Sequence, residues 1–254
     1  MNKKFLFIVV FPALTILVSC FLCTILLLFA FFSNRQTGET ITEDREIEVF
    51  EELTFKGYGT IHLTQGEKHA VAIQTDQNTI KKITTEVVNN KLAIDYKRST
   101  LWPFGPIFSN GNINIYITVP NLRSIDVDGA GRLQSGYFNT EALMIDLNGA
   151  SKLSLEDFYA DNITITASGA SEINLSGAVM NQSITVEGAS SYQAYNLTSR
   201  NCSVSLTGAS KAEVFVSEAL DVKISGAGKV TYKGTPADIK QDINGVGTVE
   251  KFSN

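Results

Sequence analysis

Three aspartates have the spacing that is most suggestive of chemistry. Asp126 and Asp128 are separated by one apolar residue, and Asp146 follows Asp126 by twenty residues. If the chain forms stacked coils of that length, the three carboxylates lie on two adjacent coils. Such a cluster can bind a cation or supply the acid and base of a polysaccharide-cleaving β-helix. We favour a third interpretation, in which the carboxylates belong to a solvated outer face that keeps the protein soluble.

Other catalytic or metal-binding patterns are missing from the sequence. His62 and His69 are the only histidines, and a zinc site needs more ligands at a recognisable spacing. No nucleophile elbow of the G-x-S-x-G type occurs, and there is no calcium-binding nonapeptide. Cys202 falls in an apolar column of the repeat, which favours a small core residue over a nucleophile. We therefore predict a protein that is not an enzyme and has no cofactor or metal.

Two further groups of residues are candidates for ligand contact. The segment 101–108 carries Trp102, Phe104 and Phe108 together with two prolines, which disfavour regular strand pairing. It either caps the fold by burying its rings or exposes them to a partner, a glycan or a membrane. Lys152, Lys211 and Lys229 occupy one column of the repeat, so their ammonium groups are expected on one outer face.

A repeat of about 18–20 residues must position all of these side chains. A Gly-Ala-small unit recurs six times, and a related Gly-Val-Gly unit closes the series. The first glycines of the seven units are Gly129, Gly149, Gly169, Gly188, Gly208, Gly226 and Gly245. Repeats of this length indicate a solenoid, in which each unit buries its apolar face against its neighbours.

The residues around each glycine alternate between apolar and polar. Apolar columns stand four and two residues before the glycine and four residues after it, with Gln241 as the one polar exception. Alternation with period two indicates strands with one buried face. Glycine suits a corner of positive φ, and small neighbours let successive coils stack closely. The sequence thus predicts an all-β fold, a single-stranded β-helix with about twenty residues per rung.

The exported part is divided as follows. Residues 46–254 form the β-solenoid, with irregular N-terminal coils and a cap over 46–98, the aromatic loop over 99–112, and repeated rungs over 113–254. In the cap, strand-like runs flank Asn89-Asn90, a pair typical of a hairpin turn. The charged pair Glu250-Lys251 is expected to protect the open C-terminal edge.

The first 34 residues are interpreted as a membrane anchor or signal segment. Residues 5–32 carry no charge, and a bilayer-spanning helix needs about 20 apolar residues. Lys3 and Lys4 precede this run, so the positive-inside rule places the remainder outside the cytoplasm, in the periplasm or at the cell surface. We expect an N-terminal transmembrane helix and a polar tether over 35–45. A lipoprotein anchored through Cys20, or a cleaved signal, is the alternative.

A combination of short motifs runs through about residues 45–250. These are Thr64-Gln65-Gly66 with Val71-Ala72-Ile73, Asn90-Lys91-Leu92-Ala93-Ile94, Ile115 to Leu122, the Gly-Ala-Gly/Ser units, and the ending Gly228 to Pro236 with Gly245-Val246-Gly247. In this combination the chain resembles the family described as putative auto-transporter adhesin, head GIN domain. The resemblance implies an exported bacterial β-solenoid with a role in adhesion, and it brings no catalytic motif.

Charge and repetition together suggest the class of partner. The net charge of −5 becomes about −7 without Lys3 and Lys4, which argues against nucleic acid. Repetitive polar ladders suit extended ligands, since weak contacts on each rung add up. We predict a non-catalytic binding or adhesion module that contacts the membrane through residues 5–32 and binds envelope polysaccharide or another surface protein. The alternatives are a polysaccharide-active enzyme using Asp126, Asp128 and Asp146, and a self-associating envelope scaffold, that is, a homo-oligomer.

Overall fold

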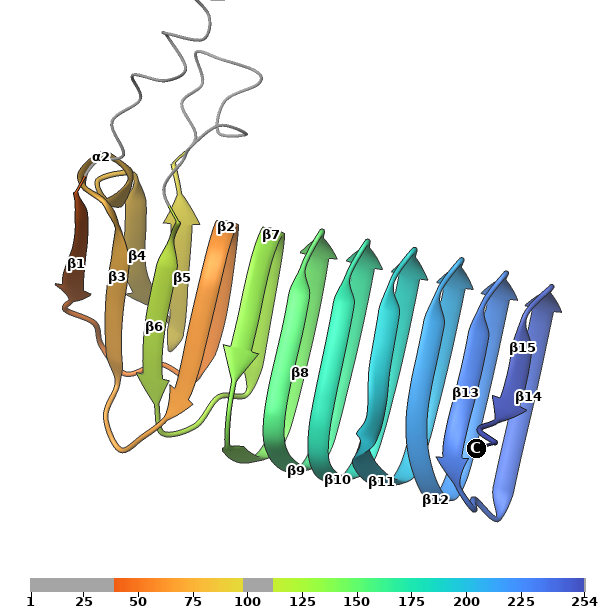
Figure 1. Cartoon of the computed structure of the whole chain (residues 1–254). Coiled ribbons are helices and arrows are strands. Elements are labelled where there is room, and N and C mark those ends of the chain that lie inside the picture. Colours follow the sequence, from red (N-terminus) through yellow and green to blue (C-terminus); the bar gives the residue numbers. More distant parts are fainter. Residues whose placement is uncertain (1–38, 98–111, 254) are drawn as a thin grey trace, which may run out of the picture. The chain divides into compact units, whose positions relative to one another are not determined.

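The repeated units form stacked coils in the computed structural model, which describes residues 39–97 and 112–253. Each coil contains a strand segment that leads into a glycine corner and one that leaves it (Figure 1). The elements are β1 (Thr40–Arg45), β2 (Glu52–Gln65), β3 (Ala70–Asp76), α2 (Gln77–Ile80), β4 (Ile83–Val88), β5 (Lys91–Tyr96), β6 (Asn114–Val119), β7 (Ser124–Ser135), β8 (Phe138–Gly149), β9 (Lys152–Gly169), β10 (Glu172–Gly188), β11 (Ser191–Gly208), β12 (Lys211–Gly226), β13 (Lys229–Gly234), β14 (Asp238–Gly245) and β15 (Thr248–Lys251).

The coils pair in parallel with the register that the columns predict. The corner glycines stand opposite one another from Gly129 to Gly245 along the stack. The apolar column four residues after the corner is also continuous, from Leu133 to Val249. The predicted all-β solenoid is therefore confirmed for the described residues.

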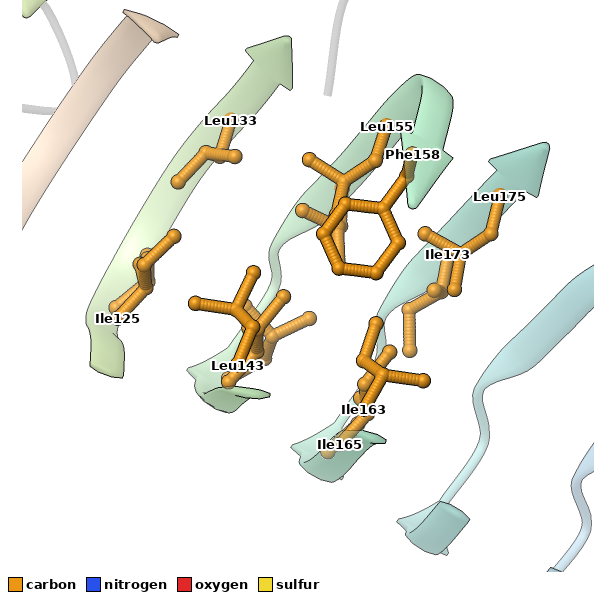
Figure 2. Close-up of a cluster of buried hydrophobic side chains, with 14 of the residues drawn as sticks. Ile125, Leu133, Leu143, Leu155, Phe158, Ile163, Ile165, Ile173 and Leu175 are labelled. Atoms are coloured by element: carbon orange, nitrogen blue, oxygen red, sulfur yellow. The ribbon is translucent and has the colours of Figure 1, made fainter. Parts of the chain in front are cut away.

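The core is a row of aliphatic side chains enclosed between the two strand segments of each coil. Figure 2 shows part of it, with Ile125 and Leu133 of β7 beside Leu143 of β8 and Leu155 and Phe158 of β9. These five side chains are at most 2% exposed. Since every coil adds to the same row, the core is continuous along the stack.

The corner glycines are required by both conformation and space. Gly169 has φ of +110°, and a Cβ at this position would lie 2.3 Å from the carbonyl oxygen of Gly149. Side chains other than hydrogen are disfavoured at such φ values. The serines that follow the corners are buried: Ser151, Ser171 and Ser190 are each 4% exposed. This agrees with their interpretation as small corner residues.

The N-terminal part of the structure differs from the sequence-based expectation in three places. Glu52–Gln65 is a full coil that pairs with β7 along its length, with Gly57 opposite Gly129, so the regular coils begin before residue 113. The strand-like run 46–50 forms no strand. Residues 40–45, expected in the tether, form β1 instead, because their backbone pairs antiparallel with β3.

A cap of antiparallel strands covers the N-terminal end of the stack. β5 and β6 extend the two halves of β2, and β4, β3 and β1 add antiparallel strands beyond them. The predicted hairpin turn joins β4 and β5 with Asn89 and Asn90 at φ of 52° and 66°. Ile80 of α2, 2% exposed, packs into the core of this end. These strands and α2 lie at the end of the stack where the sequence predicts a cap.

Several sequence-based predictions concern residues that the structure does not describe. The anchor or signal segment 1–34, with Cys20, and residues 98–111 of the aromatic loop lie outside the described residues. In the part of the chain that the structure describes, no helix combines the length and the hydrophobicity needed to cross a membrane.

Candidate functional site

The three aspartates meet on the outer face of β7 and β8. Asp126 and Asp146 stand directly opposite each other, and Asp128 lies two residues along β7, opposite Lys56 of β2. Partial burial raises the pKa of Asp126, and the negative charges of Asp146 and Asp128 raise it further. Oδ1 of Asp126 is buried without a hydrogen-bond partner among the described residues. The proximity of the other two carboxylates therefore makes the Asp126 side chain harder to ionise than an isolated aspartate.

This acidic cluster has no geometry for a metal in the described residues. No group of three or more histidine, cysteine, aspartate or glutamate side chains there is arranged to hold an ion. Lys56 and Lys91 of the neighbouring strands offset part of the negative charge at Asp126. These contacts are those of an outer face on which lysines offset the negative charge of the aspartates.

The predicted lysine column is in register but does not present a basic strip. Lys152 lies opposite Glu172, and Lys211 lies opposite Lys229. Lys152 Nζ is 2.8 Å from Glu172 Oε1, and this hydrogen bond lowers the pKa of the glutamate. Lys211 pairs with Glu213, and Lys229 Nζ is 2.7 Å from Glu250 Oε2. Each lysine is therefore matched by a carboxylate.

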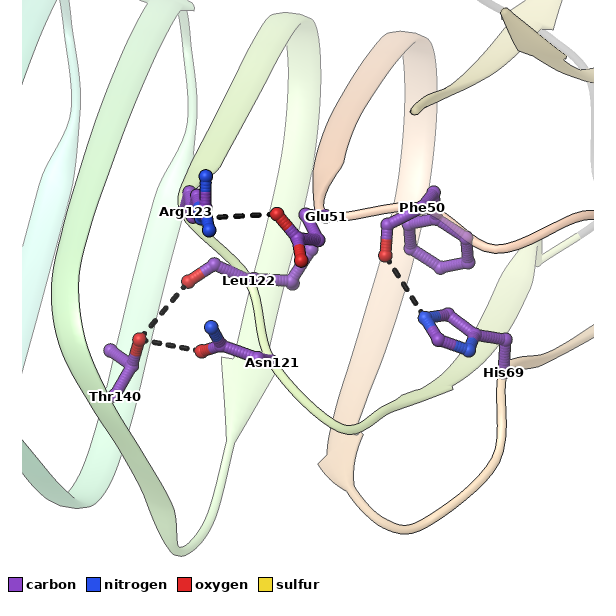
Figure 3. Close-up of polar contacts among 7 residues, drawn as sticks. All are labelled: Phe50, Glu51, His69, Asn121, Leu122, Arg123 and Thr140. Atoms are coloured by element: carbon purple, nitrogen blue, oxygen red, sulfur yellow. Dashed lines mark hydrogen bonds and ion pairs between the residues drawn. The ribbon is translucent and has the colours of Figure 1, made fainter. Parts of the chain in front are cut away.

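The histidines and the cysteine make structural contacts. His69 Nε2 is 3.0 Å from the carbonyl oxygen of Phe50, and its ring packs edge-on against the Phe50 ring (Figure 3). His62 stacks on Tyr116 with ring centroids 4.7 Å apart. Cys202 is 3% exposed, and burial raises the pKa of its thiol. Cys202 is therefore a core residue, as its column predicts, and both histidines are engaged with neighbouring side chains or backbone.

The aromatic residues Trp102, Phe104 and Phe108 lie outside the described residues. Among the exposed aromatic side chains that the structure describes, two lie close together near the bend of successive coils. Tyr137 and Tyr159 are 60% and 42% exposed, and their ring centroids are 5.9 Å apart. Met180 of the next coil is 47% exposed. Large apolar side chains gathered at a surface often mark an interaction site.

Tyr159 forms one wall of a groove of about 660 Å³, which we call the Tyr159 groove. It crosses successive coils, because Tyr159 stands between Asn139 of β8 and Ala178 of β10 in the register. The lining residues from β8 are polar, those from β10 are apolar, and β9 contributes both kinds. Its lining consists of Pro120, Asn121, Asn139, Thr140, Glu141, Tyr159, Ala160, Asp161, Ala178, Val179 and Met180.

Local hydrogen bonds fix one end of this groove. The Thr140 hydroxyl donates to Oδ1 of Asn121 at 2.6 Å and to the carbonyl oxygen of Leu122 at 3.3 Å (Figure 3). Gln65 reaches the same end, where its amide nitrogen donates to the Asn139 carbonyl oxygen at 2.7 Å. The polar groups of the groove are therefore held in place before any ligand arrives, which lowers the entropy lost on binding.

The sequence analysis did not identify the Tyr159 groove. Tyr159 directly follows Phe158, which is buried, so one of these two neighbouring aromatics had to face outward. A large aromatic residue at an outward-facing position was the available signal. The groove itself depends on which coils lie side by side at the bend, and this is a property of the stacked structure.

A second groove, of about 420 Å³, lies between strand segments that leave the corners of successive coils. It is lined by hydroxyls, amides and carboxylates and by Tyr195, whose ring lies 5.2 Å from that of Phe252. Lys233 Nζ lies 4.5 Å above the centroid of the Tyr195 ring. Register shifts after Asn174 and Ala194 accompany it. The groove is more acidic than the Tyr159 groove, since Glu156, Asp157 and Glu213 line it.

Comparison with known proteins bears on both fold and family. The model of the family described as putative auto-transporter adhesin, head GIN domain matches residues 49–236. No curated protein matches the sequence at a significant level.

Several solved structures share the fold. A putative adhesin from Bacteroides fragilis is 23% identical, with a TM-score of 0.78 over 84% of this chain and 97% of that one. A putative lipid binding protein from Parabacteroides distasonis is 22% identical, with a TM-score of 0.63 over 85% and 98%. A putative adhesin from Parabacteroides merdae is 17% identical, with a TM-score of 0.62 over 85% and 97%. At these identities the likeness shows the fold.

Proposed function

This chain belongs to the putative auto-transporter adhesin, head GIN domain family, and we propose that it is a non-catalytic binding module of the cell surface. The names of the similar solved structures, two of them putative adhesins, support this role. The proposed ligand is an extended polar chain, with envelope polysaccharide as the first candidate and a surface protein as the second.

The Tyr159 groove is the observation that carries the proposal. Tyr159 lines the groove and the ring of Tyr137 lies beside it, so two tyrosine rings offer flat apolar faces. Asn121, Asn139 and Glu141 add hydrogen-bonding groups within the lining. Amphipathic aromatics flanked by a few convergent polar groups are typical of binding sites. A sugar ring has the matching chemistry, since it offers apolar C–H faces and a rim of hydroxyls.

The repetition of the fold favours a long ligand over a small one. The groove crosses the coils of β8, β9 and β10, so a chain lying along it contacts several coils at once. On another outer face, Thr166, Thr185 and Ser205 stand in register and extend a hydroxyl ladder over three coils. Contacts that are weak on each coil add to a useful affinity when they are linked.

Binding of the full-length chain to purified envelope polysaccharides and peptidoglycan tests this function. We expect saturable binding that leaves the polymer at its original length. Tyr159→Ala should weaken the binding about tenfold, because it removes a contact ring of the groove. Tyr116→Ala is the matched control, since Tyr116 is 41% exposed and lies outside the groove. Equal binding by Tyr159→Ala and the unaltered chain would place the contact elsewhere.

An enzyme is the second candidate, and it rests on Asp126. A carboxyl group with a raised pKa beside two further carboxylates is a feature of some catalytic acids. The same incubation decides between the two functions. Shortening of the polysaccharide that disappears in Asp126→Asn and Asp146→Asn would establish catalysis and overturn the binding-only proposal.

The proposed location is the outside of the inner membrane, with residues 5–32 as the anchor. The apolar, uncharged composition of that segment supports it. The chain should stay with membranes through a high-salt wash and be released by detergent. If Cys20 carries a lipid instead, Cys20→Ala should abolish lipid labelling and change the mobility of the mature chain.

A further inference from the structure

The C-terminal end of the solenoid exposes side chains that are buried in the preceding coils. Ile239 and Ile243 of β14 continue the columns of Leu220 and Ile224, which are 1% and 2% exposed. In the last coil the same positions are 37% and 38% exposed. The charged pair Glu250-Lys251 therefore does not cover this end, contrary to the sequence-based expectation.

The backbone of the last coil is also open. Within the part of the chain that the structure describes, β14 pairs only with β12 and β15 only with β13. The opposite end differs, since α2 and antiparallel strands cover it. An apolar end with a free strand edge tends to pair with another chain. In the described residues β1 and β4 also have one open edge each, but it is at the C-terminal end that positions buried in the preceding coils become exposed.

We propose that two copies of this chain associate tail to tail, with β14 pairing antiparallel to β14 of the second copy. The sequence of β14 is self-complementary in this arrangement. With Gln241 on the two-fold axis, Lys240 lies opposite the aspartate at position 242 of the other copy. Ile239 likewise lies opposite the isoleucine at position 243. Opposite charges and matched aliphatic side chains on facing strands stabilise a pair.

The register also accounts for Gln241, the one polar residue in its column. Gln241 continues the column of Val222, which is fully buried, and is itself exposed. On the two-fold axis its carboxamide faces the same group of the second copy. An amide can donate to and accept from its twin, so the polar side chain is satisfied where an isolated one would be costly.

The proposed two-fold axis also passes through β15, the second strand of the last coil. Gln241 lies four residues before Gly245 and Val249 lies four residues after it, so the two face each other across the coil. A two-fold axis through both positions pairs β15 with its copy and places Val249 against Val249. Such an isologous contact closes after two copies, whereas head-to-tail stacking would grow into filaments. The contact does not involve the Tyr159 groove, so it is independent of the proposed ligand.

Charge reversal tests the register. The mass of the full-length chain in a non-ionic detergent is measured by sedimentation over a range of concentrations. We expect a monomer–dimer equilibrium. Lys240→Asp and Asp242→Lys should each weaken it about tenfold, because like charges then face each other twice per dimer. The double variant Lys240→Asp/Asp242→Lys restores opposite charges and should dimerise like the unaltered chain. Tyr159→Ala should have no effect.

A disulfide tests the position of the axis. Residues opposite each other in an antiparallel pair have Cα atoms about 4.5–5.5 Å apart, within the range that a disulfide spans. In a background with Cys20→Ser and Cys23→Ser, Gln241→Cys should form a covalent dimer under mild oxidation. Asn244→Cys is the control, because its copies would lie about 20 Å apart along the strands.

Three results would overturn the proposal. One is a chain that keeps the monomer mass at all concentrations and forms no Gln241→Cys dimer. Another is a dimer that neither charge reversal weakens, which would place the contact on a different surface. The last is a monomer in which the β14 amides are protected from hydrogen exchange, which would show that another segment of the same chain covers this edge.

Discussion

Gln182 is a polar residue inside the core, and its hydrogen bonds explain how the fold accommodates it. The Tyr192 hydroxyl donates to Gln182 Oε1 at 2.8 Å, and Gln182 Nε2 donates to Ser199 Oγ at 2.7 Å. The Ser199 hydroxyl in turn donates to the carbonyl oxygen of Phe215. Burial raises the pKa of Tyr192 well above its usual value, so the phenol stays protonated. The three buried side chains satisfy one another across β10 and β11.

Removing one hydroxyl should therefore be costly. Tyr192→Phe keeps the ring and leaves Gln182 Oε1 without this donor in a buried site, which costs about 1–3 kcal/mol of the free energy of unfolding. Urea unfolding of both chains measures the difference. Tyr159→Phe, at an exposed position, is the control and should change the stability little. An unchanged urea midpoint for Tyr192→Phe would contradict the assigned network.

Asp126 should make the stability depend on pH. Its folded-state pKa is raised by burial and by Asp146 and Asp128. A carboxyl group of this kind favours folding below its unfolded pKa, and this contribution is lost as the pH rises through the folded pKa. Asp126→Asn should thus be more stable than the unaltered chain near neutral pH, by less than about 1 kcal/mol because the site is partly exposed.

The same comparison at acid pH provides the check. Near pH 3, below the usual aspartate pKa of about 3.9, the difference should vanish, since the protonated carboxyl resembles the amide. The exposed Asp161→Asn is the control and should change the stability little at either pH. A stabilisation that persists unchanged at acid pH would rule out titration of Asp126 as its cause.

At the scale of the element, the glycine corner decides whether coils can stack. Gly169→Ala adds a Cβ 2.3 Å from the Gly149 carbonyl oxygen, at a φ that alanine rarely adopts. We expect a loss of about 2–4 kcal/mol in the free energy of unfolding, or failure to fold. Gly136→Ala is the matched control, because a Cβ there meets nothing within 4 Å. Equal stability of the two variants in urea would show that the corners tolerate a side chain.

Side-chain ladders contribute on the outer face of the same elements. Asn181 accepts a hydrogen bond from Asn201 and donates one to Asn162, each at 2.9 Å. These amides line a groove of about 410 Å³ with Asp221 and Asp238. The ladder links three successive coils from outside as the aliphatic column links them from inside.

At the scale of the whole molecule, the two ends of the solenoid should differ in local stability. Each coil is stabilised mainly by its neighbours, so an end with one neighbour opens first. The N-terminal coil is covered by the cap, whereas all eight residues of β14 are exposed. Hydrogen exchange of the dilute chain should therefore be fastest in β14 and β15 among the strands of the stack and slowest in β9 to β11.

Hydrogen exchange measured at several protein concentrations also tests the proposed dimer. Raising the protein concentration should slow exchange in β14 and β15 and leave β9 to β11 unchanged, because tail-to-tail pairing covers only the last coil. Uniform exchange along the stack would contradict the difference between the ends.

The local chemistry of this protein was determined by the sequence. Alternation with period two sets which side chains face inward, and glycine at a fixed interval sets where the chain turns, since both effects act within a few residues. The column register from Gly129 to Gly245, the meeting of Asp126 with Asp146, and the hairpin at Asn89-Asn90 follow from these rules. The family resemblance was confirmed as well.

Tertiary structure alone decided the features that depend on neighbouring coils. The partner of a lysine, the groove beside Tyr159, the hydrogen bonds of Gln182 and the recruitment of residues 40–45 into β1 each join residues far apart in the sequence. The sequence did not reveal Gly57 as a corner glycine, because its unit, Gly-Tyr-Gly, departs from the repeat. Its partner Gly129 also lies beyond the cap in the sequence. An outer face has no packing constraint that a periodic pattern can report, so its grooves form only when the coils are stacked.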